Sequence, residues 1–206
     1  MRFFFMLALF TFSMSGFAQS KATQKLFKSI QKNDVVLAQN ALLEGADVNG
    51  IDDFKRPTTT VLIEAVKHKR DKIVSLLLSS RADVNQRHPK DFQTGLMIAT
   101  KNNDARMVKI LLFHDADINL ETLRGETALH IAALHNSTDA GKLLLSSREI
   151  DVNAGGENCP LVTAAKEGHT GMAILLKSVV SPVCLEKAIQ SAEKNNKDMI
   201  VRILGR

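Results

Sequence analysis

Six histidines are the residues of this chain best suited to chemistry, because imidazole binds metals and exchanges protons near neutral pH. Two histidines four residues apart on a helix point from the same face, a spacing typical of zinc sites. No two histidines of this chain have that spacing; His130 and His135, for example, are five residues apart. The sequence therefore predicts no metal site and no cofactor.

Nucleophilic and acidic residues also lack a catalytic arrangement. The sequence has no Gly-x-Ser-x-Gly elbow and no phosphate-binding glycine loop. Neighbouring carboxylates such as Asp52 and Asp53 are expected at a solvated loop tip, where their pKa values would not separate into acid and base roles. We therefore expect the chain not to be an enzyme.

The N-terminal 18 residues have the pattern of a secretory signal peptide. Arg2 precedes an apolar run from Phe3 to Phe12, and Gly16 and Ala18 form a small-residue exit. A membrane anchor would need about 20 apolar residues, whereas polar residues begin at Gln19. We therefore expect cleavage after Ala18, no membrane span afterwards, and a periplasmic protein, with secretion as the second choice.

Cys159 and Cys184 are the only cysteines. An exported protein usually meets an oxidising compartment, which favours a disulfide between them. On the chain-entropy estimate such a bond adds roughly 3 kcal/mol. The alternative is a pair of buried thiols that pack as small hydrophobic side chains.

Charge and aromatic content argue against nucleic acid as a partner. The formal net charge is +5, but basic and acidic residues are interspersed along the chain and form no Lys/Arg block. Trp and Tyr are absent, so the core must come from aliphatic residues and Phe. This composition suits a stack of small helices, and we expect a monomer.

A short motif recurs along the chain and defines its organisation. It contains Asp-Val-Asn or Asp-Ile-Asn, and its copies lie at 45–49, 81–85, 115–119 and 149–153. A second motif, with Leu two residues after Thr or Cys and Ala three residues after that Leu, begins at Thr60, Thr94, Thr127 and Cys159. Between the motifs, apolar residues recur at helical spacing with a polar break, which predicts two short amphipathic helices for each repeat.

These two motifs resemble the ankyrin repeat, whose units begin with Thr-Pro-Leu-His-x-Ala and end with Gly-Ala-Asp-Val-Asn. The resemblance covers nearly all of the chain after residue 18. It implies an all-α solenoid of about six helix-turn-helix units with β-hairpin loops. The expected units span 20–49, 50–85, 86–119, 120–153, 154–182 and 183–206, and the first and last have polar outer faces that cap the stack.

The resemblance also implies where a partner protein would bind. In the ankyrin family the loop tips and the ends of the first helices line a concave face. Exposed aromatic and arginine side chains at such tips become interface anchors. The candidate binding residues of this chain are Phe54, Arg56, Lys67, His68, Lys90, Phe92, Lys101, Leu123, Arg124, Glu126 and His135.

Together these features indicate an exported protein-binding module without a cofactor. Its compartment suggests an inhibitor or immunity-type protein that sequesters an envelope enzyme such as a cell-wall hydrolase. Two alternatives stay open. One is a scaffold or assembly factor in the envelope that blocks no active site, and the other is a secreted effector that binds host or prey proteins.

Overall fold

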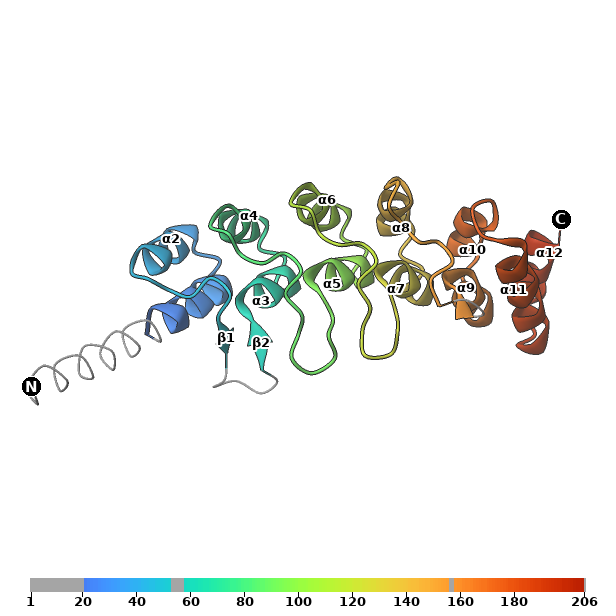
Figure 1. The fold of residues 1–206 in the computed structure, drawn as a ribbon, viewed down its shortest axis with the longest axis horizontal. Coiled ribbons are helices and arrows are strands. Elements are labelled where there is room, and N and C mark those ends of the chain that lie inside the picture. Colours follow the sequence, from blue (N-terminus) through green and yellow to red (C-terminus); the bar gives the residue numbers. More distant parts are fainter. Residues whose placement is uncertain (1–20, 53–57, 156–157, 206) are drawn as a thin grey trace, which may run out of the picture. The chain divides into compact units, whose positions relative to one another are not determined.

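The computed structural model describes residues 21–52, 58–155 and 158–205. The expected signal peptide, and with it the cleavage site, lies outside these residues. The chain forms two compact units, which we call unit 1 (Met1–Lys90) and unit 2 (Asp91–Arg206). Both units are built from short helix pairs, and the fold is the all-α repeat solenoid that the sequence predicts (Figure 1).

The described residues of unit 1 form two helix pairs and one small hairpin. A helix over 21–32 pairs with α2, and the hairpin precedes the second pair. The two hairpin strands are antiparallel, with Ile51 opposite Thr60 and Asp52 opposite Thr59. The bounds are α2 Val35–Leu43, β1 Ile51–Asp52, β2 Thr59–Thr60, α3 Val61–Lys67 and α4 Asp71–Ser79.

Unit 2 continues the pattern with helix pairs that form two rows. The first helices α5, α7, α9 and α11 pack in sequence against one another, and so do the second helices α6, α8, α10 and α12 (Figure 1). The bounds are α5 Gly95–Lys101, α6 Ala105–Phe113, α7 Ala128–His135, α8 Thr138–Leu145, α9 Pro160–Glu167, α10 Thr170–Lys177, α11 Pro182–Lys194 and α12 Asp198–Leu204.

Most of these helices are too short to be stable alone, since isolated helices below about 12 to 15 residues are marginal in water. Stacking supplies the missing stability through a leucine-rich core. Leu77 of α4 and Leu111 of α6 are fully buried, as the sequence predicts. The first helices also bury small residues such as Ala132 of α7 and Ala164 of α9, which lets neighbouring helices approach closely.

The recurring Asp-x-Asn motif joins one repeat to the next. In unit 1 the Asp47 carboxylate accepts a hydrogen bond from the Asn49 N–H at 2.9 Å, which closes a local turn. The Asn49 side-chain oxygen then accepts from the N–H of Asp83 in the following repeat at 2.8 Å. In unit 2 Asn119 accepts in the same way from Asp151. The motif therefore closes a turn within its own repeat and forms a hydrogen bond with the next repeat.

A second asparagine contact caps the second helices of unit 2. Asn103 and Asn136 both have left-handed backbones in the turn after a first helix. The Asn103 Oδ1 accepts from the N–H groups of Asp139 and Ala140, at 3.1 and 3.0 Å, at the start of α8. Asn136 accepts similarly from Met172 in α10 at 3.2 Å. These contacts satisfy helix N–H groups that have no partner within their own helix.

Two details differ from the sequence-based expectations. Among the described residues, paired strands occur only on the two sides of the loop between Ile51 and Thr60, whereas the corresponding loops of unit 2 are turns. Asp52 was expected at a solvated loop tip, but it is paired with Thr59 in strand β1 and only 8% exposed. Asp53 lies outside the described residues.

The C-terminal helix pair is covalently joined to the repeat before it. The sulfur atoms of Cys159, just before α9, and Cys184, in α11, are bonded, and their Cα atoms lie 6.2 Å apart. Both side chains are buried. Among the residues that the structure describes, no helix is long and apolar enough to cross a membrane.

Candidate functional site

Two loops of unit 2 lie side by side ahead of α5 and α7. The Leu123 N–H donates to the Asp91 carbonyl at 3.2 Å, which ties the second loop to the first. Within the second loop the Thr122 hydroxyl accepts from the N–H groups of Arg124 and Glu126, each at 3.2 Å. Gly125 supplies the left-handed residue of this turn, with φ at +73°. Internal hydrogen bonds therefore hold both loop tips.

The loop tips present apolar and charged side chains to solvent. Leu123 is 62% exposed and Phe92 is 38% exposed, and Arg124 is also exposed. Phe92 has a left-handed backbone with φ at +61°, a conformation that is costly for a bulky residue. The Asp91 carboxylate stabilises this turn by accepting from the Gln93 N–H at 3.2 Å. The strained turn presents an aromatic ring beside an exposed leucine loop.

The ends of the first helices supply the charged part of the same surface. Lys101 is the last residue of α5 and His135 is the last residue of α7, and both are exposed. Partial burial lowers the pKa of His135, and the charges of Lys101 and His169 lower it further, while Glu126 opposes the shift. The loop residue Glu126 and the two helix ends thus share one electrostatic environment, in which His135 is mainly neutral at pH 7.

These contacts bring together six of the residues predicted from the sequence, all in unit 2. We call them the unit 2 binding surface: Phe92, Lys101, Leu123, Arg124, Glu126 and His135. The surface combines two exposed apolar side chains with charges of both signs. Such a combination suits recognition of another protein, in which apolar anchors supply affinity and charged neighbours supply specificity.

The predicted residues of unit 1 are less completely defined. Lys67 and His68 are exposed at the end of α3, where the His68 ring contacts the Glu64 carboxylate at 3.3 Å. Lys90 is exposed at the end of the unit. Phe54 and Arg56 lie outside the described residues.

His130 has a structural role beneath the binding surface. Its Nδ1 accepts from the Thr127 N–H at 3.2 Å, so the proton of the neutral ring is on Nε2, which lies 3.1 Å from the Asn158 carbonyl and donates to it. Burial lowers the pKa of His130, the main effect, although the hydrogen bond to Asn158 opposes it. The neutral ring therefore joins α7 to the loop of the following repeat. In the described residues no group of three potential metal-binding side chains is placed to hold an ion.

Sequence reasoning did not identify the residues that support the loops. Asp91 and Thr122 touch solvent less than their neighbours, yet they accept the hydrogen bonds that shape both tips. The spacing of Asp91 two residues before Gln93 is typical of a side-chain-capped turn and could have indicated the first of them. The contact between Leu123 and Asp91 joins residues far apart in sequence, and no local pattern indicates it.

Comparison with known proteins supports the repeat assignment. The family model described as "Ankyrin repeats (3 copies)" matches residues 96–198, and the one described as "Ankyrin repeats (many copies)" matches residues 62–112. The fowlpox virus (strain NVSL) ankyrin repeat protein FPV031 is 34% identical over 129 residues, which are 62% of this chain and 37% of that protein.

Two mouse proteins are also similar. The B-cell lymphoma 3 protein homolog is 32% identical over 130 residues, which are 60% of this chain and 28% of that protein. The nuclear factor NF-kappa-B p105 subunit is 34% identical over 139 residues, which are 65% of this chain and 14% of that protein. The matched region thus spans well under half of each of these relatives.

Proposed function

Because this chain belongs to the ankyrin-repeat family, and is therefore a protein–protein interaction module, we propose that it binds and inhibits an exported enzyme of the cell envelope. The binding is proposed to use the unit 2 binding surface, and a cell-wall hydrolase is the kind of enzyme we expect. Inhibition requires no catalytic group on this chain, since covering an active site with a folded surface is enough.

The observation that carries this proposal is the pair of tied loop tips. Leu123 and Phe92 expose apolar area on loops that hydrogen bonds already hold in shape. A loop that is ordered before binding loses little conformational entropy when a partner arrives, which favours affinity. Arg124 lies next to Leu123, and arginine is among the residues enriched at energetic centres of interfaces.

Two features support an envelope location for the partner. The residues from Met1 to Ala18 have the composition of an export signal. The bonded pair of Cys159 and Cys184 suits an oxidising compartment such as the periplasm. An enzyme that degrades the cell wall would need restraint in that compartment, and a small soluble repeat protein could supply it.

Affinity capture from envelope extract, followed by a titration of the captured enzyme's activity, tests the proposal. We expect one envelope enzyme to be recovered and its turnover to fall in proportion to bound protein. The double variant Leu123→Ala with Arg124→Ala should raise the Kd at least about thirtyfold, since removal of hot-spot residues costs about 2 kcal/mol or more. Adding Phe54→Ala and Phe92→Ala should weaken binding further.

A matched control is the double variant Lys32→Ala with Val36→Ala, which removes one exposed cation and one exposed apolar side chain from unit 1. It should leave the Kd unchanged. If the loop variant binds the captured enzyme as tightly as the parent does, the surface assignment is wrong. If the enzyme stays fully active when bound, the chain is a scaffold and not an inhibitor.

A further inference from the structure

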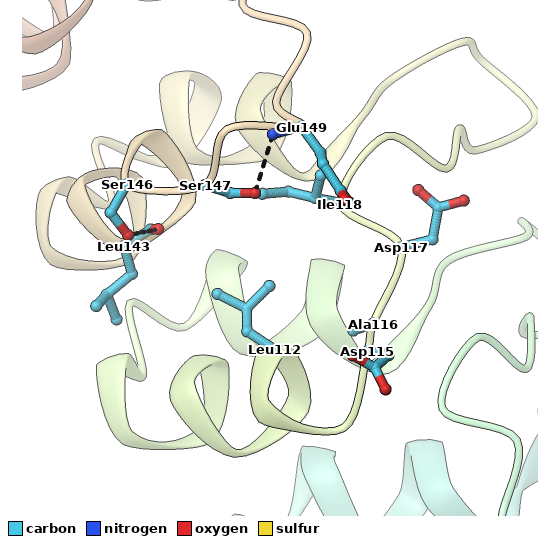
Figure 2. Close-up of a pocket in the computed structure, with 9 residues that line it drawn as sticks. All are labelled: Leu112, Asp115, Ala116, Asp117, Ile118, Leu143, Ser146, Ser147 and Glu149. Atoms are coloured by element: carbon cyan, nitrogen blue, oxygen red, sulfur yellow. Dashed lines mark hydrogen bonds between the residues drawn. The ribbon is translucent and has the colours of Figure 1, made fainter.

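Unit 2 has a groove between α6 and α8, two helices that contribute nothing to the unit 2 binding surface (Figure 2). Its volume is about 410 Å³. The groove is formed by the ends of the two helices and by the segments that follow them. It is therefore a separate feature of the molecule, and a partner bound there need not cover the loop tips.

A single extra residue in the chain after α8 distinguishes the two sides of this groove. The N-cap of α6 is Asp104 and the N-cap of α8 is Ser137. The segment from Ser137 to Asp151 is one residue longer than the equivalent segment from Asp104 to Asp117. α6 is followed by Asp115 in the left-handed region, whereas none of residues 146–151 has a positive φ. The chain after α8 consequently takes a wider path, on which the Ser147 hydroxyl accepts from the Glu149 N–H at 3.3 Å.

The floor of the groove is apolar. Leu112 rises into it from α6 and Leu143 descends from α8, and each is only partly buried (Figure 2). Ile118 closes the floor and is almost completely buried. Water in contact with these side chains would be released by an apolar ligand group.

The rim of the groove is acidic. Asp115, Asp117 and Glu149 line it, and no basic residue does. Arg148 is on the same loop as Glu149 but does not line the groove. Within the described part of the chain, the carboxylates of Asp115 and Glu149 form no ion pair. Their negative charge is therefore available to a ligand.

We propose that this groove is a docking site for a short basic segment of a partner protein, in which a lysine or arginine follows an apolar side chain. The carboxylates would repel nucleic acid and anionic lipid, which favours a basic protein segment over a phosphate-bearing partner. A basic side chain has an alkyl stem that packs on leucine while its charged end reaches the rim. An arginine can also form paired hydrogen bonds with a carboxylate. The groove thus matches both halves of such a side chain.

NMR titration of the ¹⁵N-labelled protein with the peptide acetyl-Leu-Arg-Leu-Arg-amide tests this proposal. A peptide of this size binds a shallow groove weakly, so the titration should extend to about 10 mM. We expect saturable shifts confined mainly to the amides of residues 112–118 and 143–149. The peptide acetyl-Leu-Gln-Leu-Gln-amide, which has no cation, should bind at least about fivefold more weakly.

The variant Asp115→Asn with Glu149→Gln removes the rim charge with little change of shape. Asparagine tolerates the left-handed backbone at position 115, so folding should be preserved. Binding of the arginine peptide should fall about fivefold or more, to the level of the glutamine peptide. As a control, Glu193→Gln removes an exposed carboxylate from α11 and should leave the affinity unchanged.

Three outcomes would overturn the proposal. The first is the absence of saturable shifts in residues 112–118 and 143–149, the second is equal affinity for the two peptides, and the third is unchanged affinity in the Asp115→Asn/Glu149→Gln variant. Because none of these experiments uses the enzyme captured by the loop tips, failure here would leave the proposed inhibitory function intact. Conversely, a confirmed groove would survive the failure of that function.

Discussion

Unit 2 joins its repeats in two different ways. Between the pairs α5–α6 and α7–α8, the side chain of Asn103 caps the start of α8 through two hydrogen bonds. Between α9–α10 and α11–α12, the equivalent left-handed residue is Gly168, which has no side chain with which to cap α12. That junction instead has the bond between Cys159 and Cys184.

This difference shows how one geometric requirement can be met by two chemistries. Both turns need a residue in the left-handed region, which asparagine and glycine adopt most readily. Asparagine adds a capping oxygen for the neighbouring repeat, while Gly168 allows the Lys197 side chain to lie close to its Cα, where an added Cβ would come within 3.1 Å of Lys197 Cδ. At the Gly168 junction the covalent bond supplies the inter-repeat connection that an asparagine side chain supplies elsewhere.

Removal of the packed leucines beneath the helix pairs should have a larger effect than any change at a junction. Leu111→Ala in α6 and Leu77→Ala in α4 should each lower the free energy of unfolding by about 2 to 5 kcal/mol, because both side chains are fully buried. Denaturant titration measures this loss. Leu123→Ala, at an exposed position, is the control and should change little. A loss below about 1 kcal/mol at both buried sites would contradict the stacking of the helix pairs.

Removal of the covalent link should have the next largest effect, and it should be confined to the C-terminal junction. Cys159→Ala with Cys184→Ala should cost about 3 kcal/mol on the chain-entropy estimate, and hydrogen exchange should accelerate most in α11 and α12. Mass spectrometry after alkylation without reductant should find no modified cysteine in the exported protein. Two alkylated cysteines would show instead that the thiols are free and only pack together.

Conversion of an asparagine junction into the glycine type should have a smaller effect. Asn103→Gly keeps a residue that tolerates φ of +49° but removes the cap of α8, and should cost about 1 kcal/mol. Asn136→Gly should lower the free energy of unfolding by a similar amount, because it removes the cap of α10. Amide exchange at Asp139 and Ala140 should increase in the first variant only. Equal free energies of unfolding for the parent and both variants would mean that the asparagine caps stabilise the helices no more than hydrogen bonds from water do.

A decrease in pH should produce the smallest effect, because it acts chiefly through one buried group. His130 has a pKa below its ordinary value of 6.5, since burial favours the neutral ring. Above the unfolded-state pKa, the neutral His130 ring makes its full contribution to the free energy of unfolding. This contribution is lost as the pH falls through 6.5 toward the folded-state pKa. Denaturant titrations at pH 7.5 and 5.5 should show lower stability at the lower pH. His130→Gln should reduce this dependence, and an unchanged dependence would contradict the assignment.

The sequence was sufficient to predict the fold because its two motifs encode contacts that recur in several repeats. The Thr at positions 60 and 94 predicts a helix start, and both hydroxyls accept the expected backbone N–H. The leucines at helical spacing predict the buried row that contains Leu77. Periodic signals of this kind reinforce one another along the chain.

The candidate surface was only partly predictable. Exposure of Leu123 and Arg124 follows from their place in a polar loop, but the hydrogen bond that fixes Leu123 beside Asp91 depends on how successive repeats stack. The groove between α6 and α8 was not predicted, although the extra residue before Asp151 is visible in the sequence. A one-residue difference in repeat length indicates that the backbone path changes, but it does not indicate the shape of the groove that results.

The asparagine side-chain oxygens that bridge the repeats all accept from the following repeat, although the Nδ2 groups of Asn103 and Asn119 also donate to Asp139 and Glu149. Asn49, Asn103, Asn119 and Asn136 each supply the acceptor, and the following repeat supplies the N–H. Deletion of repeats from the C-terminal side would leave spare side-chain oxygens, which water can readily hydrate. Deletion from the N-terminal side would remove the side-chain caps from the starts of α8 and α10, and loss of a helix cap costs about 1 kcal/mol. The stack is thus directional, and it should tolerate shortening from its C-terminal end better than from its beginning.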